Sequence, residues 1–296
     1  MNRPLGAALG VLADLALGEP PIAAHPVAQF GRAMNAVERA LHRDSRTAGV
    51  VHAAIGVALG GATGAALGST AFTTYLVTAG RGLGDAAREV ESALSAGDLG
   101  AARASLPALA GRAPSGLDEK EIARAVVESV AENTVDAVVA PAWWAALGGA
   151  PAAGAYRAVN TLDAMVGHRS ARYLRYGWAS ARADDIAAFV PARLTAVLVA
   201  AVRPRAASSV WATVRRDAAS HPSPNAGVAE AAFAAALGVR LGGENRYGDR
   251  VEIRPQLGDG RPPDPADIDR AVRLSRDVVL AAVGVLAAAG TLRWRR

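Results

Sequence analysis

The chain of 296 residues contains no cysteine. Disulfide frameworks, thiolate zinc sites, cysteine nucleophiles and thiol-linked lipid anchors are therefore excluded, and the redox compartment is left open. Lysine is almost missing as well, because Lys120 is the only one, so the net charge of +5 comes from arginine. Aromatic residues make up only 5%. A nucleic-acid-binding surface normally mixes lysine and arginine with exposed aromatics, so nucleic acid is not expected as a partner.

Charged residues are also few, at 20%, and they leave long apolar runs between them. A membrane-spanning helix needs about 20 apolar residues. The runs that approach this length are residues 49–80, 137–156 and 278–292, with weaker ones at 4–17 and 186–202. Asp14 lies inside the first weak run, which favours a retained helix over a cleaved signal peptide. The pattern predicts a multi-pass protein of the cell membrane with three to five crossings.

The fold class predicted from these runs is all-α: one polytopic, membrane-embedded domain over residues 1–296, with the active site on polar helical loops. These polar segments are residues 81–136, 157–185 and 240–277, and no strand-like alternation or repeat is evident. The alternative is a soluble all-α protein with buried, alanine-rich helices. Glycines in the longest run suit either close helix packing or a break in the helix, namely Gly60, Gly61, Gly64 and Gly68.

The string ESVAENTVD places Glu128, Glu132 and Asp136 at i, i+4 and i+8 of a predicted helix. Carboxylates stacked in this way repel each other by a few tenths of a kcal/mol per pair. Mg²⁺ would neutralise them, since it prefers oxygen ligands. A solvated acidic face is the simpler alternative. An apolar run with Trp143 and Trp144 follows directly, however, and a row of acids at a membrane edge is costly without a partner.

A second polar cluster covers residues 156–185, where acids and asparagine alternate with arginines. Arg157, Asn160 and Asp163 recur at three-residue steps of a predicted helix. The cations His168, Arg169 and Arg172 follow, and the segment ends in the pair Asp184 and Asp185. This composition suits a site in which Mg²⁺ and arginine share phosphate oxygens. Attraction of the arginines to anionic lipid is the alternative, but it leaves the interleaved acids unexplained.

Three shorter signals are weaker, and each is more typical of a structural turn than of a ligand site. His25 follows a Glu-Pro-Pro turn, Ser223-Pro224-Asn225 has the form of a helix cap, and Asn245 and Tyr247 lie in a glycine-rich polar turn. A phosphate-binding P-loop is excluded, because the sole lysine does not follow a glycine.

The chain resembles the adenosylcobinamide-phosphate synthase family, the membrane-bound cobalamin biosynthesis proteins labelled CobD/CbiB. The resemblance rests on six strings that occur in this order: GEP…HPV, ESVAENTVD, YRAVNTLDAMVGH, ARADD, SPNAG and GGENRYGD. The resemblance implies an ATP- and Mg²⁺-dependent ligase. Such an enzyme joins adenosylcobyric acid to (R)-1-amino-2-propanol O-2-phosphate, or to free aminopropanol, through an amide bond. A corrinoid, the amine and membrane lipid are then the partners. A complex with the downstream cobalamin synthase is compatible with this role, and the oligomeric state is left open.

On this basis each candidate residue receives a hypothetical role. The Mg²⁺ ligands would be Glu128, Glu132, Asp136, Asp184 and Asp185. Phosphate groups would be bound by Arg157, Arg169 and Arg172 and positioned by Asn133, Asn160 and Asp163. His168 or Asp163 would accept the proton of the attacking amine. The entrance for substrate would hold His25, Asn225, Asn245 and Tyr247.

Two other functions are compatible with parts of the pattern. A membrane prenyl- or phosphotransferase would hold Mg²⁺-diphosphate on two acidic motifs. Its motifs usually repeat aspartate every fourth residue, whereas here the first leads with glutamates and the second is an adjacent Asp184-Asp185 pair. A non-catalytic accessory or sensor protein on the same scaffold would be expected to lose part of the acid–arginine set, which is intact here.

Overall fold

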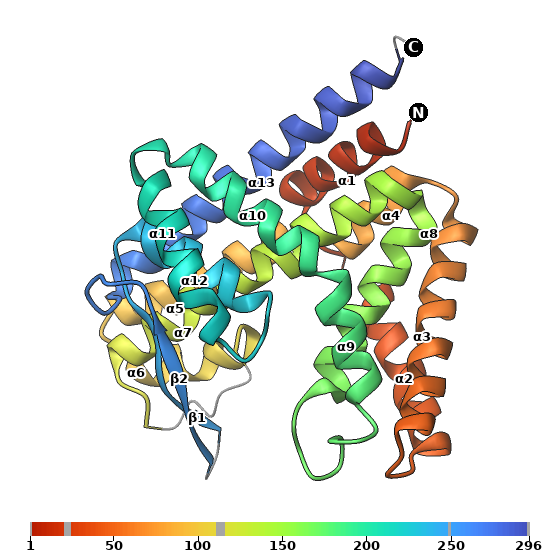
Figure 1. Ribbon diagram of the computed structural model, residues 1–296, viewed down its shortest axis with the longest axis horizontal. Coiled ribbons are helices and arrows are strands. Elements are labelled where there is room, and N and C mark those ends of the chain that lie inside the picture. The colour runs from red at the N-terminus through yellow and green to blue at the C-terminus, as the bar shows by residue number, and fades with distance from the viewer. Residues whose placement is uncertain (1, 21–24, 111–115, 248–249, 295–296) are drawn as a thin grey trace. The chain divides into compact units, whose positions relative to one another are not determined.

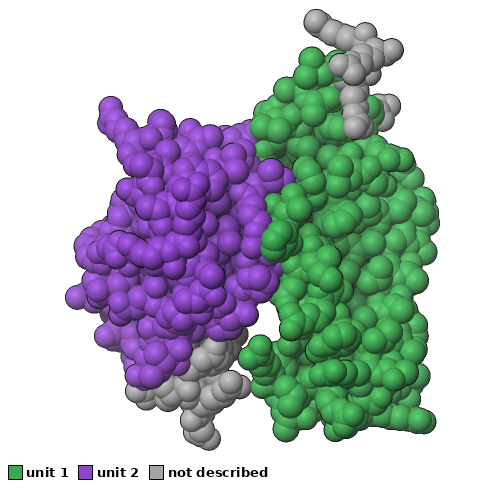
Figure 2. Space-filling model, in the orientation of Figure 1, with its two compact units in different colours: residues 1–79, 136–191, 282–296 green, residues 80–135, 192–281 purple. Residues whose placement is uncertain are grey.

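The computed structural model describes residues 2–20, 25–110, 116–247 and 250–294, and for 245–247, 250–252 and 293–294 it describes the backbone alone. The chain divides into two compact units (Figure 2). Unit 1 comprises residues 1–79, 136–191 and 282–296, and unit 2 comprises residues 80–135 and 192–281. The segments of the two units alternate along the chain, and the single domain expected from the sequence stays a prediction.

Unit 1 contains helices, turns and loops but no strand among its described residues. Its elements are α1 (Arg3–Leu17), α2 (Pro26–Leu41), α3 (Arg46–Leu67), α4 (Thr70–Val77), the π-helical turn η3 (Val135–Val139, from Asp136 on), α8 (Ala140–Leu162), the π-helical turn η4 (Asp163–Gly167), α9 (Trp178–Ala187), the start of α10 (Phe189–Val202) and the end of α13 (Pro265–Trp294). Helix α1 begins where the Asn2 side chain accepts a hydrogen bond from the Leu5 amide, at 3.1 Å.

Helices α3 and α8 run side by side in unit 1, and small residues allow this close approach (Figure 1). A Cβ atom on Gly64 would lie 2.2 Å from the Ala150 carbonyl oxygen, and one on Gly154 would lie 2.3 Å from the Gly60 carbonyl oxygen. Gly68 ends α3 in the left-handed conformation, with φ 68°. The glycines of the longest apolar run therefore serve both predicted purposes, close packing and a break.

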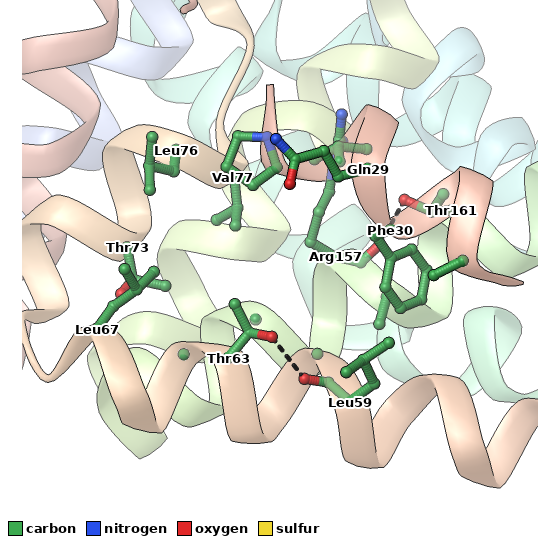
Figure 3. Close-up of a pocket in the computed structure, with 17 residues that line it drawn as sticks. Gln29, Phe30, Leu59, Thr63, Leu67, Thr73, Leu76, Val77, Arg157 and Thr161 are labelled. Carbon is green, nitrogen blue, oxygen red and sulfur yellow. Dashed lines mark hydrogen bonds between the residues drawn. The ribbon is translucent and has the colours of Figure 1, made fainter. Parts of the chain in front are cut away.

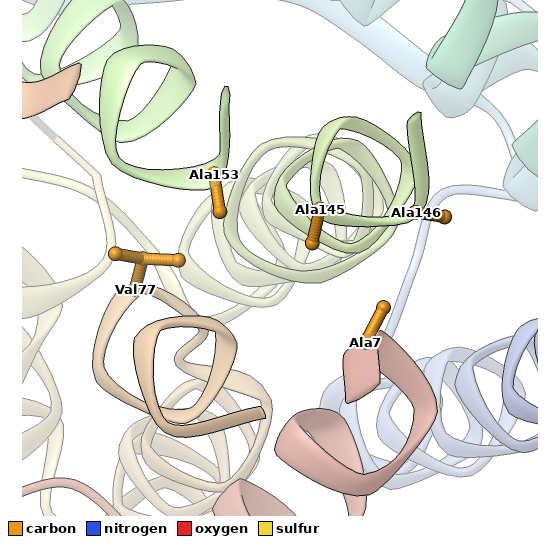
Figure 4. Packing of buried hydrophobic residues seen from close by; sticks show 5 residues of the cluster. All are labelled: Ala7, Val77, Ala145, Ala146 and Ala153. Carbon is orange, nitrogen blue, oxygen red and sulfur yellow. The ribbon is translucent and has the colours of Figure 1, made fainter. Parts of the chain in front are cut away.

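The core where α1, α4 and α8 meet is built from small side chains (Figure 4). Ala7, Ala145 and Ala153 are fully buried there, beside Val77 and Ala146. Helix α8 is kinked at Gly149, whose φ is 71°, two residues before Pro151. Alanine keeps these helices close, so the alanine-rich apolar runs form a tightly packed bundle.

One helix of the described residues, α3, is long and apolar enough to cross a membrane. The pair α9 and α10 passes the same test only if the two helices, bent by 41°, form one span. The spanning helix within the run 49–80 ends at Gly68, and the run 137–156 contains the kink of α8. The structure thus provides one or two candidate spans where the sequence predicted three to five crossings.

Unit 2 surrounds α12 (Ala226–Leu237), whose side chains are buried on nearly every face. The other elements are α5 (Gly80–Ser95), α6 (Leu99–Ser105), the 3₁₀ turns η2 (Leu106–Ala108), η5 (Pro204–Ala206) and η6 (Ala218–Ser220), α7 (Glu119–Thr134), the rest of α10, α11 (Ala207–Asp217), the strands β1 (Leu241–Tyr247) and β2 (Arg250–Leu257), and the first part of α13. Asp118 and Glu121 form a capping box at the start of α7. Phe233 of α12 is fully buried.

The β-hairpin in unit 2 corrects the all-α prediction, which treated residues 241–249 as a polar turn. Strands β1 and β2 pair in an antiparallel register in which Gly243 lies opposite Arg254 and Tyr247 opposite Arg250. A register shift occurs between Leu241 and Gly243. The signal that sequence reasoning missed is the short alternation Val251-Glu252-Ile253-Arg254, which is typical of a strand with one exposed face.

Candidate functional site

Asn160 on α8 connects two carboxylates of unit 1 that are far apart in the sequence. Its Nδ2 donates a hydrogen bond to Asp136 Oδ2 and another to Asp184 Oδ1, each at 3.3 Å. Its Oδ1 accepts from Arg157 Nη1 at 3.5 Å, one turn earlier on the same helix. Three helical segments, η3, α8 and α9, therefore bring two acids, an amide and a guanidinium together. All four residues were candidates from the sequence, in two separate motifs.

Arg157 is the centre of charge in this cluster. Glu19, Asp136 and Asp14 act on it electrostatically, so acids approach it from α1, from the segment after α1 and from η3. Its Nε is buried and has no hydrogen-bond partner among the described residues. A buried guanidinium with a donor left unused is suited to an anionic ligand, because it has already lost its hydration.

Two further buried hydroxyls beside these residues have no hydrogen-bond partner in the described part of the chain. They belong to Tyr156, which is 3% exposed and is influenced electrostatically by Asp136 and Asp184, and to Ser180, one turn before Asp184 on α9. Each unsatisfied buried polar group costs about 1–3 kcal/mol. Polar atoms left unsatisfied around one cluster are typical of a place where a ligand binds.

His25 connects the start of α2 with the same cluster. Its Nδ1 caps α2 by accepting from the Val27 amide at 3.3 Å, and its Nε2 lies 3.6 Å from Glu19 Oε2. Burial lowers the pKa of His25, Glu19 raises it, and Arg157 lowers it further, with a net decrease. The imidazole is therefore neutral near pH 7 and can accept a proton.

The donor set fits a magnesium ion held by few protein ligands. Among the described residues, no group of three or more histidine, aspartate or glutamate side chains is arranged to hold a metal. Mg²⁺ usually keeps several waters and takes one or two carboxylates together with substrate phosphates. Asp136 and Asp184, bridged by one amide nitrogen, provide such a pair. That Glu128, Glu132 and Asp185 also bind Mg²⁺ stays a prediction.

A cavity of about 330 Å³ lies beside Arg157 in unit 1 (Figure 3). Its walls come from α2, α3, α4 and α8 and are mostly apolar, with Phe30, Leu59 and Val77 among them. Among the described residues, Arg157 is the single charged one in the lining. The buried hydroxyl of Thr73, also in the wall, has no hydrogen-bond partner among the described residues. Arg157 thus belongs both to the acidic cluster and to an apolar cavity.

The candidate cations that follow α8 form a separate group around Glu38 of α2. Arg172 donates to Glu38 Oε1 from Nη2 at 2.9 Å and from Nε at 3.2 Å, and Tyr173 Oη donates to the same oxygen at 2.9 Å. The exposed ring of His168 packs edge-on against Tyr173, with 4.9 Å between ring centroids. Arg172, predicted to bind phosphate, is thus engaged in anchoring the loop after η4 to α2.

Three further predicted site residues of unit 1 lie at partly or fully exposed positions. Asp185 pairs with Arg182 at 3.3 Å on α9, and Arg169 is exposed in the loop. Asp163 begins η4 and is half-buried; it influences Tyr156 electrostatically, which places it at the edge of the Asn160 cluster.

Glu128 of α7 has a structural partner in unit 2. Its Oε1 accepts a hydrogen bond from the Gly242 amide at 2.8 Å, and Arg124, one turn earlier, approaches it to 3.9 Å. Arg124 also donates to the carbonyl oxygens of Gly242 and Glu244. The acidic row therefore does have a neighbouring arginine, and Glu128 joins α7 to β1. Its role as a metal ligand stays a prediction.

The string ESVAENTVD also contains Glu132, Asn133 and Asp136. Asn133 directs its amide to Ser129, donating to the carbonyl at 3.0 Å and to the hydroxyl at 3.2 Å. Glu132 is partly buried on α7. Asp136 follows the change from α-helix to π-helix at Val135, which interrupts the regular i, i+4, i+8 spacing.

A second buried polar group in unit 2 contains one predicted residue, Asn225. Its Oδ1 accepts from Arg193 Nη1 at 3.0 Å. His221 Nε2 lies 3.7 Å from Glu230 Oε1 and 3.5 Å from Arg254 Nη1. The Ser223 hydroxyl accepts from the Ala226 amide at 3.1 Å, as the predicted cap requires. The side chains of Asn245 and Tyr247, also predicted here, lie outside the described residues.

Comparison with known proteins identifies the family. The model of the CobD/CbiB protein family matches residues 7–275. The chain belongs to the CobD/CbiB family. The cobalamin biosynthesis protein CobD of Mycobacterium tuberculosis H37Rv is 50% identical over 97% of this chain and 95% of its own. Similar proteins of the same name from Geobacter metallireducens (43% identity, 86% of each chain) and Chromobacterium violaceum (42% identity, 98% and 97%) also match. No solved structure matches.

Within this CobD/CbiB chain, sequence reasoning missed several residues of the clusters. Tyr156 and Glu19 lie inside the strings that carry the family resemblance, so their motifs were visible although their roles were not. Glu38 and Glu230 gave no comparable signal: each is an isolated acid in an apolar or mixed helix. A single acid among buried alanines, as in α12, is nevertheless unusual, because an unpaired buried carboxylate is costly.

Proposed function

We propose that this CobD/CbiB protein is an ATP- and Mg²⁺-dependent ligase. It would join the side-chain carboxylate of adenosylcobyric acid to the amine of (R)-1-amino-2-propanol O-2-phosphate, or of aminopropanol, to give adenosylcobinamide phosphate or adenosylcobinamide. Family membership supports a role in cobalamin biosynthesis. The observation that carries the chemistry is the part-buried cluster of Arg157, Asn160, Asp136 and Asp184.

In this proposal Asp136 and Asp184 hold the magnesium ion. When bound, Mg²⁺ neutralises phosphate oxygens and draws charge from the transferred phosphoryl group. Asn160 fixes the positions of the two carboxylates, because both accept hydrogen bonds from the same nitrogen. A neutral amide in this position holds the acids together without adding to their repulsion.

Arg157 would bind a phosphate oxygen. Its Nε has no protein partner among the described residues, and a guanidinium matches the geometry of phosphate. The acids around Arg157 offset its positive charge, and Mg²⁺ would offset theirs when it binds together with phosphate. The apolar cavity on its other side keeps water from the reacting groups, which protects an activated acyl group from hydrolysis.

The reaction requires a proton acceptor. The corrinoid carboxylate takes the terminal phosphoryl group of ATP, releasing ADP, and the amine then attacks the acyl carbon while inorganic phosphate leaves. The attacking nitrogen loses a proton in this step. Neutral His25 and half-buried Asp163 lie next to the cluster and are the proposed acceptors. His168, which the sequence named as an acceptor alongside Asp163, packs against Tyr173.

We also propose that the protein resides in the cell membrane. Less than a third of the apolar window of α3 is buried inside the structure, whereas a core helix of a soluble protein is mostly buried. Val50, Val51 and Ile55 of this helix are exposed, at 47%, 45% and 39%. An outward apolar face of this length suits hydrocarbon.

The test is ligation by the purified full chain in detergent, with ATP, Mg²⁺, adenosylcobyric acid and each amine, followed by mass spectrometry of the corrinoid. Asp184→Asn and Asp136→Asn should each lower the rate of product formation at least about 100-fold, the size typical of removing a group that stabilises transition-state charge. Asp85→Asn, a change of the same kind at an exposed position, serves as the control and should leave the rate unchanged. Full activity in both site variants would contradict the proposed site, and no amide product from the unaltered chain would contradict the ligase function.

A further inference from the structure

A concave surface in unit 2 gathers arginines from two helices. It encloses about 570 Å³ and lies between the end of α10, the end of α12 and the first part of α13. Half of its eight lining residues are arginines, Arg203, Arg270, Arg273 and Arg276, and a single acid, Asp277, accompanies them. We call this surface the arginine pocket. None of its residues was assigned a function from the sequence.

The pocket has a fixed wall. Arg270 donates to the Leu237 carbonyl oxygen at the end of α12, at 2.7 Å, and is also bound to Asp267, which is fully buried. This holds the first part of α13 against α12. Arg273 and Arg276 follow on the same helix at three-residue steps, so their side chains extend from one face of a rigid element.

The arginines differ in how far their charge is compensated. Arg203 pairs with Asp277 at 2.7 Å, and Arg273 pairs with Asp269. Arg276 is exposed and makes no hydrogen bond or ion pair with any described residue. The chain as a whole is rich in arginine. This general abundance does not explain why Arg203 and three arginines about 70 positions later line one hollow, where like charges repel each other.

We propose that the arginine pocket binds a phosphate group. Guanidinium groups recognise phosphate oxygens through paired hydrogen bonds, and several of them around one hollow fit an anion with more than one oxygen face. The volume exceeds that of one phosphate ion, so the hollow has room for a larger phosphate-bearing molecule. This inference goes beyond the proposed ligase function and does not depend on it.

Two sources share this chemistry, a soluble polyphosphate chain and the headgroup of an anionic phospholipid. Leu280, 42% exposed, lines the pocket one turn after Arg276 and begins the apolar part of α13. Phosphate beside an apolar surface is the arrangement of a lipid headgroup, whereas a closed ring of arginines alone would favour a soluble anion. The experiment therefore has one arm for each source.

In the first arm, sodium tripolyphosphate is titrated into the full chain in neutral detergent, and binding is measured by isothermal titration calorimetry. In the second arm, native mass spectrometry counts the phosphatidylglycerol and phosphatidylcholine molecules retained by the chain from mixed micelles. The variant is Arg273→Gln/Arg276→Gln. The matched control is Arg205→Gln/Arg215→Gln, which removes two exposed arginines of the same unit outside the pocket.

We expect binding in at least one arm, weakened about tenfold or more in the pocket variant and unchanged in the control. Binding should also weaken as the salt concentration rises. The arm that responds identifies the source. The proposal is overturned if neither probe binds, or if the pocket variant and the control weaken binding equally, since net charge alone would then explain the effect. The single variant Arg276→Gln guards against misfolding, because Arg276 has no partner among the described residues to lose.

Discussion

At the scale of single residues, the structure separates side chains that hold the fold from those that are available for chemistry. Glu38, Glu128 and Arg172 all have close partners within their own unit. Arg157, Tyr156 and Ser180 have buried polar atoms with no partner among the described residues. This contrast, more than the count of acids, supports Arg157 as the centre of the proposed site.

The Glu38 carboxylate should make stability depend on pH. Burial would raise the pKa of Glu38, but hydrogen bonds from Arg172 and Tyr173 outweigh burial and hold it below the ordinary value of 4.5. A carboxyl with a lowered pKa stabilises the folded state above that ordinary value, and the stabilisation is lost as the pH falls through the folded-state pKa. We expect Glu38→Gln to lower the Tm by about 2–4 °C at pH 7, with a smaller difference at pH 4.

This expectation is checked by thermal unfolding of both proteins in detergent across that pH range. Glu89→Gln, at an exposed acid on α5, is the control and should show little change at either pH. A Tm difference for Glu38→Gln that grows as the pH falls would have the wrong sign and would contradict the arrangement around Arg172.

At the scale of elements, the contact between α3 and α8 depends on particular glycines. Gly64 faces the Ala150 carbonyl oxygen, whereas a Cβ atom on Gly61 would lie 3.8 Å from Ala155, an ordinary contact. Gly64→Ala should therefore destabilise the fold by about 1–3 kcal/mol through overpacking. Gly61→Ala should be neutral or stabilising by up to about 1 kcal/mol, since alanine favours a helix.

The two substituted positions lie three residues apart on α3, and each variant replaces glycine by alanine. Each variant therefore serves as the control for the other. Denaturant titration followed by circular dichroism measures the difference. Equal stability of the two proteins would show that α3 and α8 do not pack as closely as described.

The local sequence pattern predicts some of the helical elements and not others. The start of α7 has a local signal, because Asp118 and Glu121 have the spacing of a capping box. The change to a π-helix at Val135 has no such local signal. It alters the face on which Asp136 projects, which is why the predicted acidic row of Glu128, Glu132 and Asp136 is interrupted.

At the scale of the whole molecule, the proposal of membrane residence concerns α3. Val51→Glu/Ile55→Glu places two charges on its exposed apolar face. A charge at the centre of a bilayer costs about 2.5–3.5 kcal/mol or more. We expect this variant to be extracted from membranes by alkaline carbonate, while the unaltered chain is retained.

The control for extraction is Ala101→Glu/Ala104→Glu, which adds the same two charges at exposed positions of the polar helix α6. It should stay in the membrane fraction. If the α3 variant and the control are both retained and both folded, α3 does not contact lipid.

The sequence alone determined the helical class and the family, because apolar runs and long motifs are patterns of neighbouring residues. It also named all four members of the Asn160 cluster as candidates. Their convergence was decided by the tertiary structure, since η3, α8 and α9 must pack before an amide can reach two carboxylates 48 positions apart. The same holds for Glu38 with Arg172, and for the arginine pocket: charges from distant segments become neighbours only when burial of the apolar faces forces their helices together.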